Sequence, residues 1–118
     1  FDYGGREEDF WRPERPFGTL RAFRRHRQQP DLLSNPGRQD LTADVNFSRI
    51  EAAGLAAGMT TETFSTQRDF LTRIAGRIWE GQLAFEPWTT GHTRQFQTLT
   101  HPEHLGRAFR VLLQRRET

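Results

Sequence analysis

The sequence predicts an α/β fold in which a mixed sheet is flanked by helices, and three observations carry this prediction. Stretches of alternating polar and apolar residues, typical of strands, take turns with stretches of helical spacing. The resulting order is strand, strand, helix, strand, helix, helix, strand, which suits the second half of an open α/β sheet. The ten Phe and three Trp residues among 118 argue against a disordered chain.

The first third of the chain is expected to hold two strands joined by loops. Residues 1–5 resemble the end of a buried strand followed by a turn at paired glycines. Residues 5–17 are expected to form a loop because two prolines remove backbone donors. Residues 18–26 alternate in polarity and predict a strand, and residues 27–40 predict a loop that contains an Asn-Pro-Gly turn signal.

The next segment predicts a helix and a short strand. Asn46 and Ser48 are both suited to cap a helix that begins near Asp44, because their side chains accept hydrogen bonds from free backbone N–H groups. Gly58 is expected to end this helix. Residues 59–65 are rich in Thr and Phe and predict a strand.

The last part of the chain predicts two helices and a final strand. Thr66 is expected to cap a helix whose apolar spacing continues to Leu83. A weaker helical pattern covers residues 90–99. Alternation over residues 109–113 favours a strand, with a helix from Pro102 onward as the alternative.

Charge and composition exclude several functions. The formal net charge is only +2 although the pI is about 10.3. All 17 basic residues are Arg, so few side chains lose a proton between the pKa of His and that of Arg, and the small positive charge persists to high pH. The pI is therefore no evidence for nucleic acid, and the basic segment around Arg24 and His26 fits a solvated strand edge better than a phosphate-backbone site. The absence of Cys excludes disulfides, thiolate zinc sites and cysteine nucleophiles. No apolar run reaches the length of a membrane span.

Known cofactor and metal motifs are also missing from the sequence. It has no Gly-x-Gly-x-x-Gly loop, no phosphate-binding loop and no serine in a nucleophile-elbow context. His101 and His104 are three residues apart, but Pro102 prevents them from sharing a helical face. We therefore expect no metal site and no cofactor-binding residue in these 118 residues.

Several strings, six of them given below, resemble the C-terminal half of one protein family, in order and at matching spacing over nearly the whole chain. The six are Asp2-Tyr3-Gly4, Pro13-Glu14-Arg15, Gly18-Thr19-Leu20-Arg21, Asp40-Leu41-Thr42-Ala43, Phe64-Ser65-Thr66-Gln67 and Leu105-Gly106. The family is the MidA-like (mitochondrial dysfunction A) family of S-adenosylmethionine-dependent methyltransferases. The resemblance implies that residues 1–118 are the C-terminal part of a single class I, Rossmann-like methyltransferase domain.

Two positions depart from the family's usual pattern. Asp44 stands where the family usually has His, and Asn46 stands where it usually has Asp. Any role of that His or Asp in binding or chemistry is therefore altered here. Asn46 remains a good helix cap, so the second change is structurally mild.

The resemblance also implies an activity, a cofactor and partners. The mitochondrial member methylates an arginine of a protein, so the implied reaction is methyl transfer from S-adenosylmethionine to a protein substrate. The cofactor site is expected mostly upstream of residue 1. A second copy of the chain is a possible partner, whereas nucleic acid and membrane are not expected. The implied location is the cytoplasm of a bacterium or the mitochondrial matrix of a eukaryote.

The candidate site lies at the predicted carboxyl end of the first strand, where open α/β sheets bind ligands. Asp2 is expected to orient a guanidinium group and Tyr3 to wall the methyl group, so both are candidate catalytic residues. The candidate substrate-binding residues are Gly4, Arg24, His26, Asp40 and Thr42. A structural role is the alternative for each: a turn cap for Asp2, packing for Tyr3, and an Asx-turn for Asp40. A non-enzymatic protein-interaction module that retains the family fold is the competing functional class.

Overall fold

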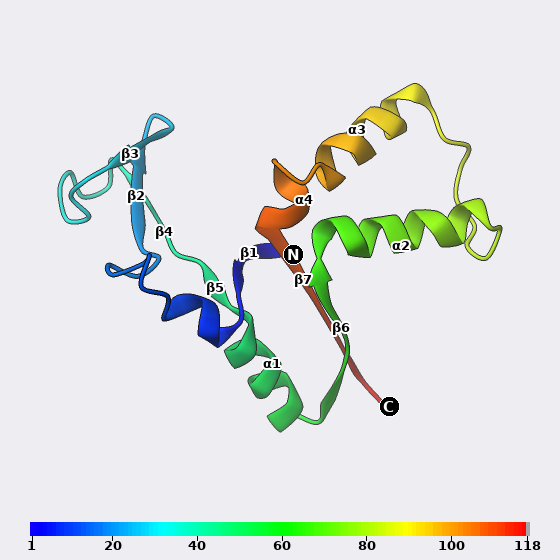
Figure 1. Ribbon diagram of the computed structural model, residues 1–118, viewed down its shortest axis with the longest axis horizontal. Helices are drawn as coiled ribbons and strands as arrows, with labels where there is room; N and C mark the ends of the chain where they lie inside the picture. Colours follow the sequence, from blue (N-terminus) through cyan, green and yellow to red (C-terminus); the bar gives the residue numbers. More distant parts are fainter. Residues whose placement is uncertain (118) are drawn as a thin grey trace.

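A mixed four-stranded sheet forms the centre of the computed structural model, which describes residues 1–117 (Figure 1). Its strand order is β5-β1-β7-β6. The strands are β1 (Asp2–Gly5), β5 (Val45–Asn46), β6 (Met59–Thr66) and β7 (Phe109–Arg116). β7 runs antiparallel to β1 and β6, whereas β1 and β5 are parallel. With its flanking helices, this sheet confirms the predicted α/β class.

The turn predicted within residues 1–5 is wrong, because Asp2–Gly5 is a strand throughout. Gly4 and Gly5 pair with Val45 and Asn46 of β5. A Cβ atom added to Gly4 would lie 2.0 Å from the carbonyl oxygen of Val45. The glycines therefore allow a close approach of two strands. Paired glycines are also typical of turns, so the sequence did not distinguish the two cases.

A second, antiparallel sheet stands to one side of the first (Figure 1). It consists of β2 (Arg21–Arg24), β3 (Arg27–Gln29) and β4 (Asp40–Thr42) in the order β3-β2-β4. The predicted strand over residues 18–26 is therefore too long, and the predicted loop over residues 27–40 is wrong at both ends.

The physical reason for this correction is an unusual hairpin turn. Arg25 and His26 join β2 to β3 with φ angles of 49° and 61°, in the left-handed region. Two-residue hairpin turns with positive φ normally use Asn and Gly. Because Arg and His carry no such signal, the sequence did not indicate where the strand turns back.

The helix α1 (Phe47–Ala56) begins and ends as the sequence predicts, within a few residues. Of the two candidate caps, Asn46 is the one used, and its side chain accepts a hydrogen bond from the Arg49 N–H at 3.2 Å. Gly58, with a φ of 79°, follows the helix. Phe47 at the first turn is 4% exposed, and its ring lies 5.4 Å from that of Phe64 on β6. This contact fixes α1 against the central sheet.

The helix α2 (Gln67–Trp79) begins after the predicted cap, where the Thr66 hydroxyl accepts a hydrogen bond from the Asp69 N–H at 3.1 Å. It ends before Leu83, which corrects the predicted length. Gly81 adopts a φ of 74° just beyond the last turn and closes the helix there.

Three further helical elements complete the chain. The helix α3 (Thr90–Thr100) confirms the weaker helical pattern. The helix α4 (Leu105–Ala108) leads directly into β7, so the predicted final strand is confirmed and the alternative helix stops at Ala108. A 3-10 helix, η1 (Glu7–Phe10), lies within the predicted loop over residues 5–17.

The helices α2 and α3 form an arm that packs largely through aromatic rings (Figure 1). The Trp88 ring lies 5.7 Å from Trp79 and 5.5 Å from Phe96, measured between centroids. At the other end of the arm, the Gln67 amide donates a hydrogen bond to the Leu99 carbonyl at 2.9 Å. The arm is therefore held at both ends.

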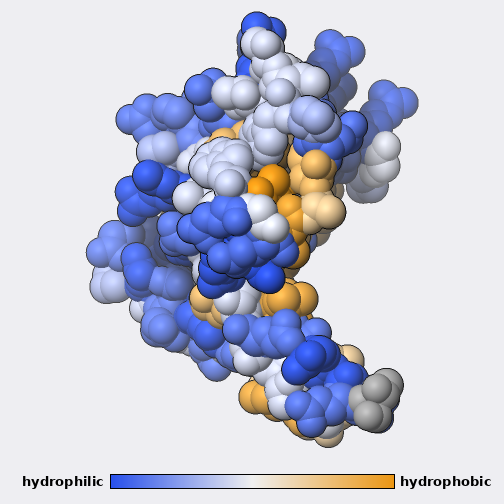
Figure 2. All heavy atoms as spheres, turned by 90° about the vertical axis from the view of Figure 1, so that its right-hand side faces the viewer, coloured by the Kyte–Doolittle hydropathy of each residue, from blue (hydrophilic) through white to orange (hydrophobic). Residues whose placement is uncertain are grey.

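Little apolar surface is fully buried by the described residues themselves. The buried hydrophobic residues are Ala22, Phe47, Ala75 and Val111. The accessible surface is 9181 Å², whereas a compact protein of 13.8 kDa exposes roughly 6600 Å². The radius of gyration is 17.8 Å, against about 13.5 Å for a compact chain of this length. Hydrophobic side chains gather beside a hollow in the space-filling view (Figure 2).

Candidate functional site

A cleft of about 360 Å³ lies where β1 of the central sheet meets the three-stranded sheet. We call it the Tyr3 cleft. It is lined by Tyr3, Arg21, Phe23, Thr42, Ala43 and Asp44. Arg21 pairs with Thr42 across β2 and β4, and Phe23 lies two residues after Arg21, so these side chains share one face of the sheet. The cleft thus combines two aromatic rings, a hydroxyl group and a carboxylate.

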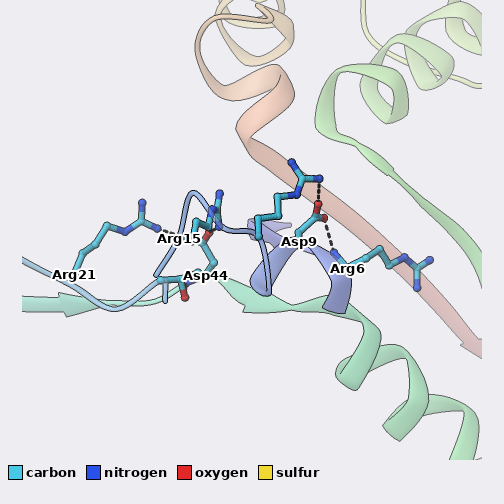
Figure 3. Close-up of polar contacts among 7 residues, drawn as sticks. Arg6, Asp9, Arg15, Arg21 and Asp44 are labelled. Carbon is cyan, nitrogen blue, oxygen red and sulfur yellow. Dashed lines mark hydrogen bonds and ion pairs between the residues drawn. The ribbon is translucent and has the colours of Figure 1, made fainter. Parts of the chain in front are cut away.

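Asp44 is the charged centre of this cleft. Its carboxylate makes ion pairs with Arg15, at 2.8 Å, and with Arg21 (Figure 3). Its backbone N–H donates a hydrogen bond to the Thr19 hydroxyl at 3.1 Å. Only 11% of the Asp44 side chain is exposed. A partly buried carboxylate that already binds two guanidinium groups is suited to bind a third in exchange.

Tyr3 is positioned by its strand neighbours. It pairs with Phe109 of β7, and the two ring centroids lie 3.9 Å apart. Tyr3 remains 47% exposed, so its ring borders the cleft rather than filling the core.

Asp2 lies on the other side of β1. Successive residues of a strand point to opposite faces of the sheet. Asp2 accordingly borders a separate cavity of about 370 Å³, whose walls include Phe47, Ile50 and Leu112. Its carboxylate accepts a hydrogen bond from the Tyr3 N–H at 2.7 Å. The structure therefore does not bring the two candidate catalytic side chains into one cleft, and it places Asp2 within β1 rather than at its carboxyl end.

The structure does not bring the candidate substrate-binding residues together in one place. Thr42 lies in the Tyr3 cleft, and Gly4 lies in β1 against β5. His26 and Asp40 border a third cavity of about 470 Å³ together with Phe23 and Arg25. Because Phe23 also lines the Tyr3 cleft, the two cavities adjoin. Arg24 pairs with Arg27 at the end of the β2–β3 hairpin.

A second set of polar contacts lies around η1 and α1. The Arg6 guanidinium pairs with Glu51 of α1 and lies 4.0 Å from the Phe64 ring centroid. The backbone N–H of Arg6 donates to the Asp9 carboxylate at 3.0 Å, and Asp9 also pairs with Arg12 (Figure 3). The hydrogen bond from Arg6 lowers the pKa of the Glu51 carboxyl below its usual value. These contacts join η1 to α1 and so help to place β1.

Gly4 and Gly5 do not form a cradle for S-adenosylmethionine. Such a cradle needs a glycine-rich turn between a strand and a helix, whose backbone approaches the ligand. Gly4 and Gly5 instead lie inside β1, and the space next to Gly4 is taken by Val45.

Two further properties of residues 1–117 bear on function. They contain no group of three or more His, Asp or Glu side chains arranged to hold a metal ion. None of their helices is long and apolar enough to cross a membrane.

Sequence comparison identifies the family. The family described as "Putative S-adenosyl-L-methionine-dependent methyltransferase" matches residues 1–65, more than half of the chain. The chain belongs to this methyltransferase family. The matched part of this methyltransferase-family chain includes every residue that lines the Tyr3 cleft. No protein of curated function matches the sequence.

Two crystal structures of proteins from Burkholderia thailandensis, members of one superfamily, are similar to this methyltransferase-family chain. An uncharacterized protein is 29% identical with a TM-score of 0.75, and the match covers 94% of this chain and 30% of that one. A superfamily member and "likely methyl transferase", bound to S-adenosyl-homocysteine, is 30% identical with a TM-score of 0.74. That match covers 98% of this chain and 30% of the other. The chain therefore spans about 30% of the length of these solved structures.

Sequence reasoning missed the central role of Asp44 and its two arginines. Asp44 was singled out only as a departure from the usual family pattern. Arg15 and Arg21 lie inside the quoted strings, but nothing in their spacing indicates that both contact one carboxylate. The available signal was a conspicuous one: an acidic residue at a position where the family usually has a basic one.

Proposed function

We propose that the complete protein is a MidA-like methyltransferase that transfers the methyl group of S-adenosylmethionine to an arginine of a protein substrate. In this proposal residues 1–118 supply the substrate side of the active site. Family membership and the S-adenosyl-homocysteine-bound structure similar to this chain support methyl transfer. In this proposal other parts of the protein hold the cofactor, which is consistent with the position of Gly4 and Gly5 inside β1.

One observation favours an arginine substrate: the carboxylate in the Tyr3 cleft already binds guanidinium groups. Arg15 is 44% exposed, so a substrate arginine can take its place on Asp44 without a buried charge being left unpaired. The rings of Tyr3 and Phe23 offer flat walls on which a planar guanidinium stacks.

The chemical task of these residues is positioning. Methyl transfer breaks the carbon–sulfur bond of the donor, forms a carbon–nitrogen bond and leaves S-adenosylhomocysteine, while the proton lost by the nitrogen passes to solvent water. The nucleophilic nitrogen must lie in line with the departing sulfur, and a fixed carboxylate achieves this by holding the rest of the guanidinium. In this proposal Asp44 and Thr42 hold the substrate, and Tyr3 excludes water from the methyl group.

A direct test uses the complete protein, methyl-labelled S-adenosylmethionine and peptides that contain either arginine or lysine at one position. Mass spectrometry should find the label on arginine only. Label on lysine, or no label from a protein that binds the cofactor in calorimetry, would overturn the proposal. The second result would favour the non-enzymatic interaction module.

The role of Asp2 is tested separately, because it lies on the other side of β1. One charge-assisted hydrogen bond to substrate contributes roughly 1.5–3 kcal/mol, or about ten- to a hundredfold in rate. We expect Asp2→Asn to lower methyl transfer at least tenfold if Asp2 orients the guanidinium, with little change in the melting temperature. Full activity of Asp2→Asn together with loss of activity in Asp44→Asn would assign the substrate to the Tyr3 cleft alone.

A further inference from the structure

The positive charge of the chain is concentrated in the three-stranded sheet. Residues 21–42 contain five arginines and two aspartates, a net charge of +3, whereas the whole chain has +2. The rest of the chain is therefore slightly negative. Residues 24–27, which we call the arginine hairpin, are four consecutive basic residues at the end of this sheet.

The arginines of the hairpin differ from those that precede them. Arg6, Arg12, Arg15 and Arg21 each pair with a carboxylate. Within residues 1–117, Arg24, Arg25 and Arg27 make no ion pair. Their charge is therefore free to attract an anionic partner.

The register of the hairpin makes this arrangement unfavourable in the free protein. Arg24 and Arg27 are direct partners across β2 and β3. Like charges directly opposite each other destabilise a strand pair. Bound carboxylates would offset this repulsion, so binding of an anionic partner would stabilise the hairpin.

An exposed leucine on the same face indicates what kind of partner fits. Leu41 pairs with Ala22, and Arg24 lies two residues after Ala22, so Leu41 shares a face with Arg24 and its partner Arg27. Leu41 is 55% exposed. A leucine offers a nucleic acid no stacking surface, whereas it packs readily on an apolar side chain of a protein.

We propose that the arginine hairpin and Leu41 form a docking surface for an acidic segment of a partner protein, with an apolar residue next to its carboxylates. Arg24, Arg27 and Leu41 lie on the face opposite the one that lines the Tyr3 cleft, so a segment docked on them leaves the cleft open. The interaction is distinct from methyl transfer and does not require it.

The test uses the complete protein and two labelled peptides, Gly-Glu-Glu-Leu-Glu-Glu-Gly and the same peptide with Gln in place of Glu. Fluorescence anisotropy at low salt should show tighter binding of the acidic peptide, with the difference shrinking as salt rises. The double variant Arg24→Gln with Arg27→Gln should raise the Kd of the acidic peptide about three- to tenfold. The matched control, Arg68→Gln with Arg94→Gln, removes two exposed helical arginines and should leave this Kd unchanged.

A second measurement distinguishes a loss of binding from a loss of the folded structure. Because Arg24 and Arg27 repel each other, the single variant Arg27→Gln should bind the acidic peptide more weakly and yet unfold at a slightly higher temperature. Equal Kd values for the two peptides would overturn the proposal, as would equal losses in the double variant and the control. Tighter binding of a short single-stranded DNA than of the acidic peptide, lost in the double variant, would replace the protein partner by a nucleic acid.

Discussion

Replacing Asp44 by Asn tests whether one carboxylate organises the Tyr3 cleft. The substitution keeps the size of the side chain and removes the charge that faces Arg15 and Arg21. The two arginines are 44% and 41% exposed, so solvent screens each pair although Asp44 itself is mostly covered. Two such pairs contribute about 0.4–2 kcal/mol together. We expect the variant to lose that much free energy of unfolding.

The assay is urea unfolding of the complete protein at neutral pH and low salt. A matched control is Glu62→Gln, which removes one carboxylate from the more exposed pair between Glu62 and Arg115. This control should cost less, because its carboxylate side chain is 38% exposed, against 11% for Asp44. A double-mutant cycle between Asp44→Asn and Arg15→Gln then measures the coupling of that pair directly.

Two results would refute the reasoning. Equal losses for Asp44→Asn and Glu62→Gln would mean that the burial of Asp44 adds nothing to its ion pairs. A coupling of zero between Asp44 and Arg15 would mean that the pair does not hold the cleft together.

Two further predictions concern the strands and the helix that support the cleft. Gly4→Ala should destabilise the protein by about 1–3 kcal/mol more than Gly58→Ala. Both positions have positive φ, but of the two only Gly4 has a neighbour, Val45, that an added Cβ would meet. Equal melting temperatures for the two variants would contradict this prediction. The Arg6 hydrogen bond lowers the pKa of Glu51 from its usual 4.5, so the pair stabilises the fold fully above that pH and loses its contribution as pH falls through the lower folded-state value. The difference in unfolding free energy between the wild type and Glu51→Gln should therefore shrink below about pH 4.5, and a difference independent of pH would argue against the pair.

Local signals in the sequence predicted most helices and the longer strands. Asn46 and Thr66 cap α1 and α2 as expected, because a cap depends on a side chain and the backbone within three residues of it. The strands β6 and β7 also follow from local composition and alternation. The resemblance to the methyltransferase family was visible at this level too, since it depends on short strings in order.

The sequence by itself therefore determined the α/β class, the helix starts and the methyltransferase family. Only the tertiary structure decided that Asp2 and Tyr3 line different cavities, that β1 pairs with β5 through its glycines, and that Arg15 and Arg21 converge on Asp44. Helix caps and hydrophobic periodicity depend on residues that are close in the sequence, so a short stretch of sequence is enough to predict them. Strand pairing and ion pairs between distant segments depend on the path of the whole chain, which no short pattern records.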